Sequence, residues 1–285
     1  MQRMTTERTE LRAPAIEVIA VPNDGVMSDQ PTNATIVGTA EVIIIDPGDQ
    51  PGVAVIQEAL ARRGNIRVTA IVLTHGHHDH TLAAPELKRI FACPILLNPA
   101  ERPILPRTID WSEIDQPLAG GMTLTVDGIR LEAIDTPGHS PGQVALYEPD
   151  SRTLIAGDLV SGHGTVGIFP PHGKMSEYFA SLERAQRLDA RTIIPGHGPT
   201  LTQPPDLFAQ YIARRTTRER EIYAVVARGP ATIEEMLPGL YPDVSPQFRR
   251  AAAATILAHL EKLREEGRVA PDSDNPFAAR WAVRG

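Results

Sequence analysis

The stretch Thr74-His75-Gly76-His77-His78-Asp79-His80 (THGHHDH) decides the fold, and it follows directly on the apolar run Val68–Leu73. That run predicts a buried strand, so the polar residues after it stand at a strand end, where loops present functional side chains. Alternate residues of an extended loop point to the same side, so His75 and His77 can share one metal ion. Asp79 and His80 follow closely enough to reach a second ion. Imidazole nitrogen and carboxylate oxygen are zinc ligands, and the stretch therefore predicts a metal site.

Three later turns also present a ligand-type residue beside glycine, each after a strand-like run. They are Thr136–Gly142 with His139, Ala156–Asp158 with Asp158, and Pro195–Pro199 with His197. A further acidic residue, Asp46, ends the β-branched run Glu41–Ile45. Because these residues all stand at predicted strand ends, we expect them to converge with residues 74–80 on one site.

The charge of the chain is unevenly distributed. The whole sequence has a formal net charge of −7, yet residues 204–285 hold 12 Lys and Arg against 11 Asp and Glu. The acidic balance therefore lies in residues 1–203, the part that carries the histidines of the motif. Such a balance provides no global attraction for nucleic acid or an anionic membrane surface.

Composition also bounds the environment of the protein. The single cysteine, Cys93, excludes an internal disulfide, and its apolar neighbours predict a buried thiol in a reducing compartment. The polar start, Met1–Arg12, lacks the apolar segment of a signal peptide, and no run reaches the length of a membrane span. We therefore expect a cytoplasmic protein.

Strand-like and helical runs alternate in two similar halves of the first 200 residues. Strands are expected at 16–21, 34–38, 41–45, 68–73, 94–97, 122–126, 130–134, 143–147, 153–156 and 192–194. Helices are expected at 51–63, 82–91 and 176–188, whereas the Pro-rich segment 98–120 fits no element. This order predicts an α+β fold in which two mixed sheets pack together with helices outside.

The pattern of the sequence changes near residue 203, from alternating strands and helices to mainly helical segments. A long amphipathic helix is expected at 206–228, and Thr232 with Glu235 forms a capping box that starts a second. A third helix at 245–266 and two short strands complete a winged-helix-like module. We therefore divide the chain into a catalytic domain, 1–203, and a C-terminal domain, 204–285. The basic run Arg214, Arg215, Arg218 and Arg220 fits a solvated helix face paired with Glu219 and Glu221 better than a phosphate-binding patch.

The order H-x-H-x-D-H, then a lone His, a lone Asp and a lone His, resembles the metallo-β-lactamase superfamily, closest to its dinuclear, glyoxalase-II-like branch. The resemblance implies an αββα sandwich. The segments Arg214–Glu221 and Ala258–Gly267 look like the winged-helix tail of the lactamase-β-2-like group. The likeness extends from about residue 15 to residue 270.

The resemblance also implies roles for the motif residues. His75, His77 and His139 would hold a first metal ion, Asp79, His80 and His197 a second, and Asp158 would bridge the two with a hydroxide. Asp79 and Asp158 would thus serve catalysis, Asp79 also orienting the nucleophile. His78 is not expected to ligate, and Asp46 would accept a hydrogen bond from a ligand imidazole. Two divalent ions are expected, zinc in the first place, with iron and manganese left open.

The chemistry expected from such a site is hydrolysis by a metal-activated hydroxide. Only 38 residues separate Asp158 from His197, too few for the cap domain inserted in some nucleic-acid-cleaving members. We favour an ester or thioester substrate, small or carrier-bound. A single-strand endoribonuclease and a mononuclear iron enzyme of the persulfide-dioxygenase type remain alternatives. The nearly neutral tail argues against a DNA-binding regulator, and a homodimer stays open.

Overall fold

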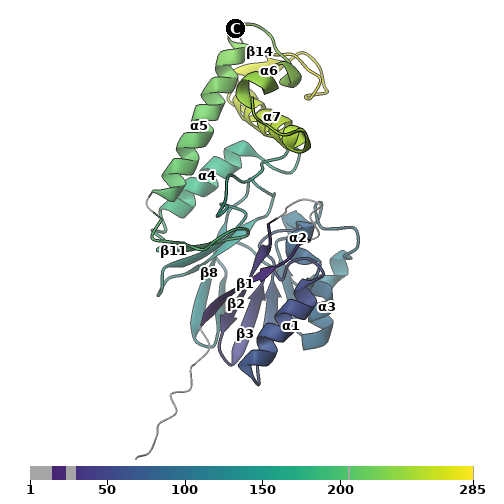
Figure 1. Cartoon of the computed structure of the whole chain (residues 1–285), viewed down its shortest axis with the longest axis vertical. Helices are drawn as coiled ribbons and strands as arrows, with labels where there is room; N and C mark the ends of the chain where they lie inside the picture. Colours follow the sequence, from purple (N-terminus) through teal and green to yellow (C-terminus); the bar gives the residue numbers. More distant parts are fainter. Residues whose placement is uncertain (1–14, 24–29, 205, 285) are drawn as a thin grey trace, which may run out of the picture.

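The computed structural model describes residues 15–23, 30–204 and 206–284, so the polar start at residues 1–12 lies outside the described residues. Two six-stranded sheets pack face to face, and helices cover their outer sides (Figure 1). The predicted α+β fold of two mixed sheets with outer helices is confirmed. Most elements begin and end within a few residues of their expected positions.

The first sheet is mixed. Its strands, in spatial order, are β1 Ile16–Val21, β2 Thr32–Gly38, β3 Glu41–Ile45, β4 Arg67–Val72, β5 Ile95–Leu97 and β6 Gln116–Pro117. The first three pair antiparallel, and β3 to β6 pair parallel. Helices α1 (Gly52–Arg63) and α3 (Ala84–Phe91) cover its outer face, where their apolar residues pack with Cys93, buried as expected.

The second sheet is built mainly from antiparallel strands. In spatial order it contains β12 Leu201–Thr202, β11 Thr192–Pro195, β10 Thr153–Gly157, β9 Val144–Glu148, β8 Ile129–Asp135 and β7 Thr123–Val126. Helix α4 (Met175–Gln186) packs on its outer face. Between the sheets, Ile45 and Val72 from the first meet Leu146 and Ile155 from the second. Strands that are buried on both faces consist of continuous apolar runs, and for this reason β3, β4 and β10 could be predicted from the sequence.

The C-terminal module stands beyond one end of the sandwich and is joined to it by a long helix (Figure 1). It contains α5 Leu207–Val226, α6 Ile233–Leu240, α7 Arg249–Glu265 and the hairpin of β13 Val269–Pro271 with β14 Trp281–Val283. The expected capping box of Thr232 and Glu235 is present. Trp281 is fully buried in the core of this module. No helix in the described part of the chain is long and apolar enough to cross a membrane.

The prediction that α5 presents its charges to solvent is wrong for two residues. Arg215 and Glu219 are only 5% and 8% exposed. Arg215 donates to the Val166 carbonyl, and Glu219 accepts from Lys262 of α7 at 2.9 Å. They belong to the buried helical stripe of Phe208, Tyr211, Arg215, Glu219, Ile222 and Val226. Because their partners lie outside α5, the local charge pattern resembled an exposed face.

Two further segments differ from expectation around the histidine stretch. The helix expected at 82–91 is present as α3, but an unexpected helical turn, α2 (His78–Thr81), precedes it, so that Asp79 and His80 stand on a helix. The unassigned segment 98–120 contains the short 3₁₀ helices Pro99–Glu101 and Trp111–Glu113, followed by β6. Both segments contribute to the site described next.

Candidate metal centre

The predicted ligand residues come from loops at one edge of the two sheets. His75 and His77 follow β4, Asp79 and His80 belong to α2, His139 follows β8, Asp158 follows β10 and His197 follows β11. In Figure 1, α2 lies at the end of the first sheet that is turned toward the C-terminal module. The fold therefore brings together residues that are up to 122 positions apart in the sequence.

A first group contains His75, His77 and His139, each of which offers one ring nitrogen, and these three nitrogens lie within 4.8 Å of one another. The Nε2 atom of His139 is 2.9 Å from Nδ1 of His77. The Nδ1–H of His139 donates to the Gly167 carbonyl at 2.7 Å, which leaves Nε2 free to bind a cation. The Nε2 atom of His75 is buried and has no partner among the described residues. A metal ion would satisfy that nitrogen, so the group fits one.

Burial keeps this group in the protonation state that metals require. It lowers the pKa of His75 well below its ordinary value, with the neighbouring imidazoles adding to the effect. Burial, followed by the proximity of His139, lowers the pKa of His77 to about 3. The imidazoles are therefore neutral at physiological pH, and a neutral imidazole is the form that binds a metal.

A second group contains Asp79, His80 and His197, again with ligand atoms within 4.8 Å of one another. The Nε2 atoms of His80 and His197 are 3.3 Å apart, and the same atom of His197 is 3.3 Å from Oδ2 of Asp79. The Nδ1–H of His197 donates to the Pro31 carbonyl at 3.1 Å. As with His139, a backbone carbonyl takes the outer proton and turns Nε2 toward its neighbours.

Asp46 connects the second group to the first sheet. Its carboxylate accepts from the Thr74 amide at 2.7 Å and from the Thr74 hydroxyl at 2.6 Å, and lies 3.0 Å from Nδ1 of His80. Burial disfavours the charged imidazolium of His80, but the nearby carboxylates, first Asp46 and then Asp158 and Asp79, overcome this and raise the pKa of His80 to about 10. Asp46 thus fixes the ring with Nε2 directed at the group, and binding of a cation there must release a proton.

Asp158 lies between the two groups. Its Oδ2 atom is 3.5 Å from Nε2 of His139 and 3.7 Å from Nε2 of His197, and its Oδ1 atom is 3.7 Å from Nε2 of His80. Gly196 leaves room for this carboxylate, because a Cβ atom there would lie 2.2 Å from Oδ1. One side chain therefore faces the nitrogens of both groups.

His78 stands apart from these residues. Its side chain is 24% exposed, and its Nδ1 atom is 3.8 Å from Oδ1 of Asp79. Within the described part of the chain it belongs to neither of the two groups. The residue between His77 and Asp79 is thus oriented differently from both.

Sequence reasoning missed Glu101. This side chain is fully buried, and its carboxylate accepts from the Gly76 amide at 2.7 Å, the Ser140 hydroxyl at 2.8 Å and the Gly142 amide. It therefore joins the loop of His75 and His77 to the loop of His139. Burial raises the pKa of Glu101, while these three donors act against that rise.

Gly76 has a different purpose from the one that its place in the motif suggests. A glycine between two ligands suggests a tight turn, but the φ of Gly76 lies outside the left-handed region that favours glycine. A Cβ atom at Gly76 would lie 3.1 Å from the Glu101 carbonyl oxygen and 3.2 Å from its carboxylate. Glycine at this position therefore lets the segment of Glu101 approach closely without a tight contact.

The chain matches a known family along most of this fold. Residues 27–197 match the metallo-beta-lactamase superfamily. The chain belongs to this superfamily. Residues 232–281 match the beta-lactamase associated winged helix domain, which confirms the nature of the C-terminal module.

Individual relatives cover nearly the whole chain. A beta-lactamase-like protein 2 homologue from Caenorhabditis elegans is 30% identical over 92% of this chain and 88% of its own length. An atrochrysone carboxyl ACP thioesterase from Aspergillus fumigatus is 29% identical over 90% of this chain and 84% of its own. The crystal structure of a metallo-beta-lactamase family protein from Thermus thermophilus has 25% identity and a TM-score of 0.77, covering 95% of this chain and 99% of the other.

These findings support the predicted lactamase-β-2-like branch. Superfamily membership, together with the two groups of histidine and aspartate, makes this chain a metal-dependent hydrolase that binds divalent metal ions.

Proposed function

We propose that this hydrolase uses a dinuclear site, with zinc as its metal, to cleave esters or thioesters of small or carrier-bound acyl groups. The observation that carries the proposal is the pair of ligand groups with the Asp158 carboxylate between them. His75, His77 and His139 would hold one ion, and Asp79, His80 and His197 the other. A ligand set of imidazoles and carboxylates suits zinc, iron and manganese.

The side chains divide the work of such a site. Divalent ions, when bound, supply an activated water nucleophile and an electrophilic contact for the carbonyl oxygen. Asp46 holds His80 in place, and the Gly167 carbonyl does the same for His139. Asp79, whose carboxylate lies 3.3 Å from His197, would accept a hydrogen bond from the nucleophile and orient it. Burial acts to raise the pKa of Asp79, but the hydrogen bond with His197 and the proximity of the His80, His197 and His78 rings together outweigh burial and lower it, which keeps the carboxyl ionised.

Two observations favour an acyl substrate over RNA. One relative, which aligns with this chain over 84% of its own length, is named an atrochrysone carboxyl ACP thioesterase. The first 203 residues carry the acidic balance of the chain, and an excess of carboxylates repels a polyanion. A thioester presents one carbonyl carbon and a good leaving group, and needs no phosphate-binding surface.

A parallel assay tests the proposal. The purified protein is given acyl thioesters, lactones and single-stranded RNA, and the variants His77→Ala and His78→Ala are compared on each. We expect thioester hydrolysis that His77→Ala abolishes and His78→Ala largely preserves, because His78 belongs to neither ligand group. RNA cleavage that is lost with His77→Ala, without thioester hydrolysis, would replace the acyl substrate by RNA.

Metal analysis tests the dinuclear part separately. We expect about two zinc ions for each chain, and loss of one or both in Asp158→Ala, because the bridging carboxylate holds both. One tightly bound iron in the wild type would refute the dinuclear hydrolase and favour an oxygen-dependent reaction.

A further inference from the structure

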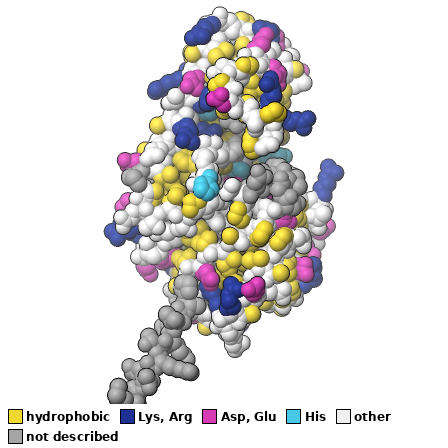
Figure 2. Space-filling view, viewed as in Figure 1, with side chains coloured by type: hydrophobic (Ala, Val, Ile, Leu, Met, Phe, Trp, Pro, Cys, Tyr) yellow, Lys and Arg dark blue, Asp and Glu magenta, His cyan; other side chains and the backbone are white. Residues whose placement is uncertain are grey.

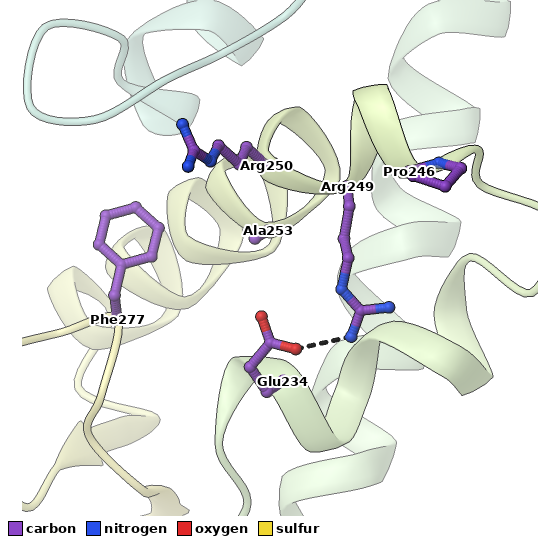
Figure 3. Close-up of a pocket in the computed structure, with 6 residues that line it drawn as sticks. All are labelled: Glu234, Pro246, Arg249, Arg250, Ala253 and Phe277. Carbon is purple, nitrogen blue, oxygen red and sulfur yellow. Dashed lines mark hydrogen bonds and ion pairs between the residues drawn. The ribbon is translucent and has the colours of Figure 1, made fainter.

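The C-terminal module contains a cavity that the metal chemistry does not use. It has a volume of about 500 Å³ and opens where α7 begins (Figure 3). Its lining combines side chains from α6, the 3₁₀ turn Pro246–Phe248, α7 and the loop of the hairpin: Glu234, Pro246, Arg249, Arg250, Ala253 and Phe277. A volume of this size suits a ligand group or an inserted side chain.

The cavity has a positive side. Arg249 forms an ion pair with Glu234 at 2.6 Å, whereas Arg250 has no hydrogen bond or ion-pair partner among the described residues. Figure 3 shows the Arg250 side chain pointing away from the ion pair. Both arginines stand in the first turn of α7, which contains no acidic residue. Cations at the amino end of a helix oppose its dipole, so an anion bound beside Arg250 would offset the unfavourable charge that Glu234 leaves uncompensated.

The same surface presents aromatic rings to solvent. Phe277 is 46% exposed and lines the cavity, and Phe248, 54% exposed, precedes Arg249 as the N-cap of α7. They are two of only four large hydrophobic residues that are exposed within the described part of the chain. Aromatic residues and arginine are enriched where proteins bind one another. Figure 2 shows Lys and Arg side chains projecting from this upper part of the molecule with hydrophobic atoms among them.

We propose that Phe248, Arg249, Arg250 and Phe277, the α7 surface, dock the carrier protein that delivers the acyl group. The partner is a folded domain that presents carboxylates to the arginines and an apolar side chain to the phenylalanines. This inference rests on the proposed function, because it assigns a docking site to a carrier-bound thioester.

Charge and position favour this occupant. The cavity lining holds two arginines, Arg249 and Arg250, against the single carboxylate of Glu234, so a partner that presents carboxylates is attracted to this surface. The module also lies beyond the same end of the sandwich at which α2 is found (Figure 1). A carrier bound to the module can therefore extend its thioester arm toward the metal centre, while its body stays on the arginines.

The test compares one acyl group on two carriers. Acetoacetyl groups are attached either to a phosphopantetheinylated acyl carrier protein or to N-acetylcysteamine, and KM and kcat are measured for wild type, Arg250→Glu and Phe277→Ala. We expect both variants to raise KM for the protein-bound thioester about tenfold and to leave the small thioester unchanged, since interface residues of this kind contribute that much. Arg228→Glu is the matched control, because Arg228 is exposed on the same module outside the cavity.

Each outcome decides one proposal. An unchanged KM for the protein-bound thioester in both variants overturns the docking site, although hydrolysis itself continues. Equal loss on both substrates shows damage to the fold and also overturns it. A wild type that hydrolyses neither thioester refutes the proposed function instead. Binding of single-stranded RNA that Arg250→Glu abolishes, with carrier kinetics intact, would assign the α7 surface to nucleic acid and reject the carrier.

Discussion

Glu101 provides the sharpest test of how the metal centre is held together. Its carboxylate is fully buried and accepts three hydrogen bonds, one through Oε2 from Gly76 and two through Oε1 from Ser140 and Gly142. Glu101→Gln keeps the volume and one oxygen, so the amide can still serve Ser140 and Gly142. Its NH₂ group then faces the Gly76 amide, and one donor loses its acceptor. Glu101→Ala leaves all three donors without a hydrogen-bond acceptor.

The expected losses follow from these counts. A buried donor without a partner costs about 1–3 kcal/mol, so Glu101→Gln should lower the free energy of unfolding by about 2 kcal/mol. Three such donors set an upper range for Glu101→Ala, but the variant also avoids burying a carboxylate, and we expect about 4 kcal/mol. The folded state of many domains is worth only about 5–15 kcal/mol, so Glu101→Ala should remain folded with little margin.

The assay is urea unfolding of the metal-free protein, combined with metal titration of the folded variants. Because Glu101 joins the loops of the first ligand group, Glu101→Gln should weaken one metal position about tenfold and leave the other largely unaffected. Glu86→Gln is the control, since Glu86 is an exposed carboxylate in the same half of the domain. Wild-type stability and wild-type metal affinity in Glu101→Gln would refute the argument.

Three further predictions concern the same centre. Asp46→Ala should weaken metal binding about 10- to 100-fold, because the ring of His80 loses its acceptor, and equilibrium dialysis measures this. Gly196→Ala should lower kcat far more than it lowers the melting temperature, since its Cβ would displace the carboxylate of Asp158; equal effects on both would contradict a local cause. Removal of metal by a chelator should lower the melting temperature, and zinc at about 100 times its Kd should restore about 2.7 kcal/mol for each site. An unchanged melting curve after verified metal removal would show that the ligand loops are ordered without ions.

Much of the fold could be predicted from the sequence because its central strands are buried on both faces. Such strands form continuous apolar runs, and the residue types that bind metals stand out where Glu41–Ile45 and Val68–Leu73 end. The structure of residues 98–120 could not be predicted, because short 3₁₀ turns and a two-residue strand have no periodic pattern of apolar residues. Glu101 lay hidden there as an ordinary charged residue in a Pro-rich segment.

The burial of charged side chains could not be predicted from the sequence, and the reason is the same in each case. Glu101, Arg215 and Glu219 each have a partner on another element, so nothing beside them in the sequence distinguishes them from surface charges. Arg215 and Glu219 are four residues apart, a spacing that usually indicates an exposed pair on one helix. Only the burial of the neighbouring apolar positions of α5 reveals which side of the helix they occupy.

The orientation of the histidines depends on groups that carry no sequence signal at all. The Nδ1 atoms of His139 and His197 are held by the carbonyls of Gly167 and Pro31, and every residue has a carbonyl. A motif can therefore identify which imidazoles meet, but not what turns their Nε2 atoms toward one another. His80 is the exception, because its acceptor is the carboxylate of Asp46, a residue type that stands out at the end of its strand. The support of a metal site is predictable from sequence to the extent that side chains, rather than backbone, provide it.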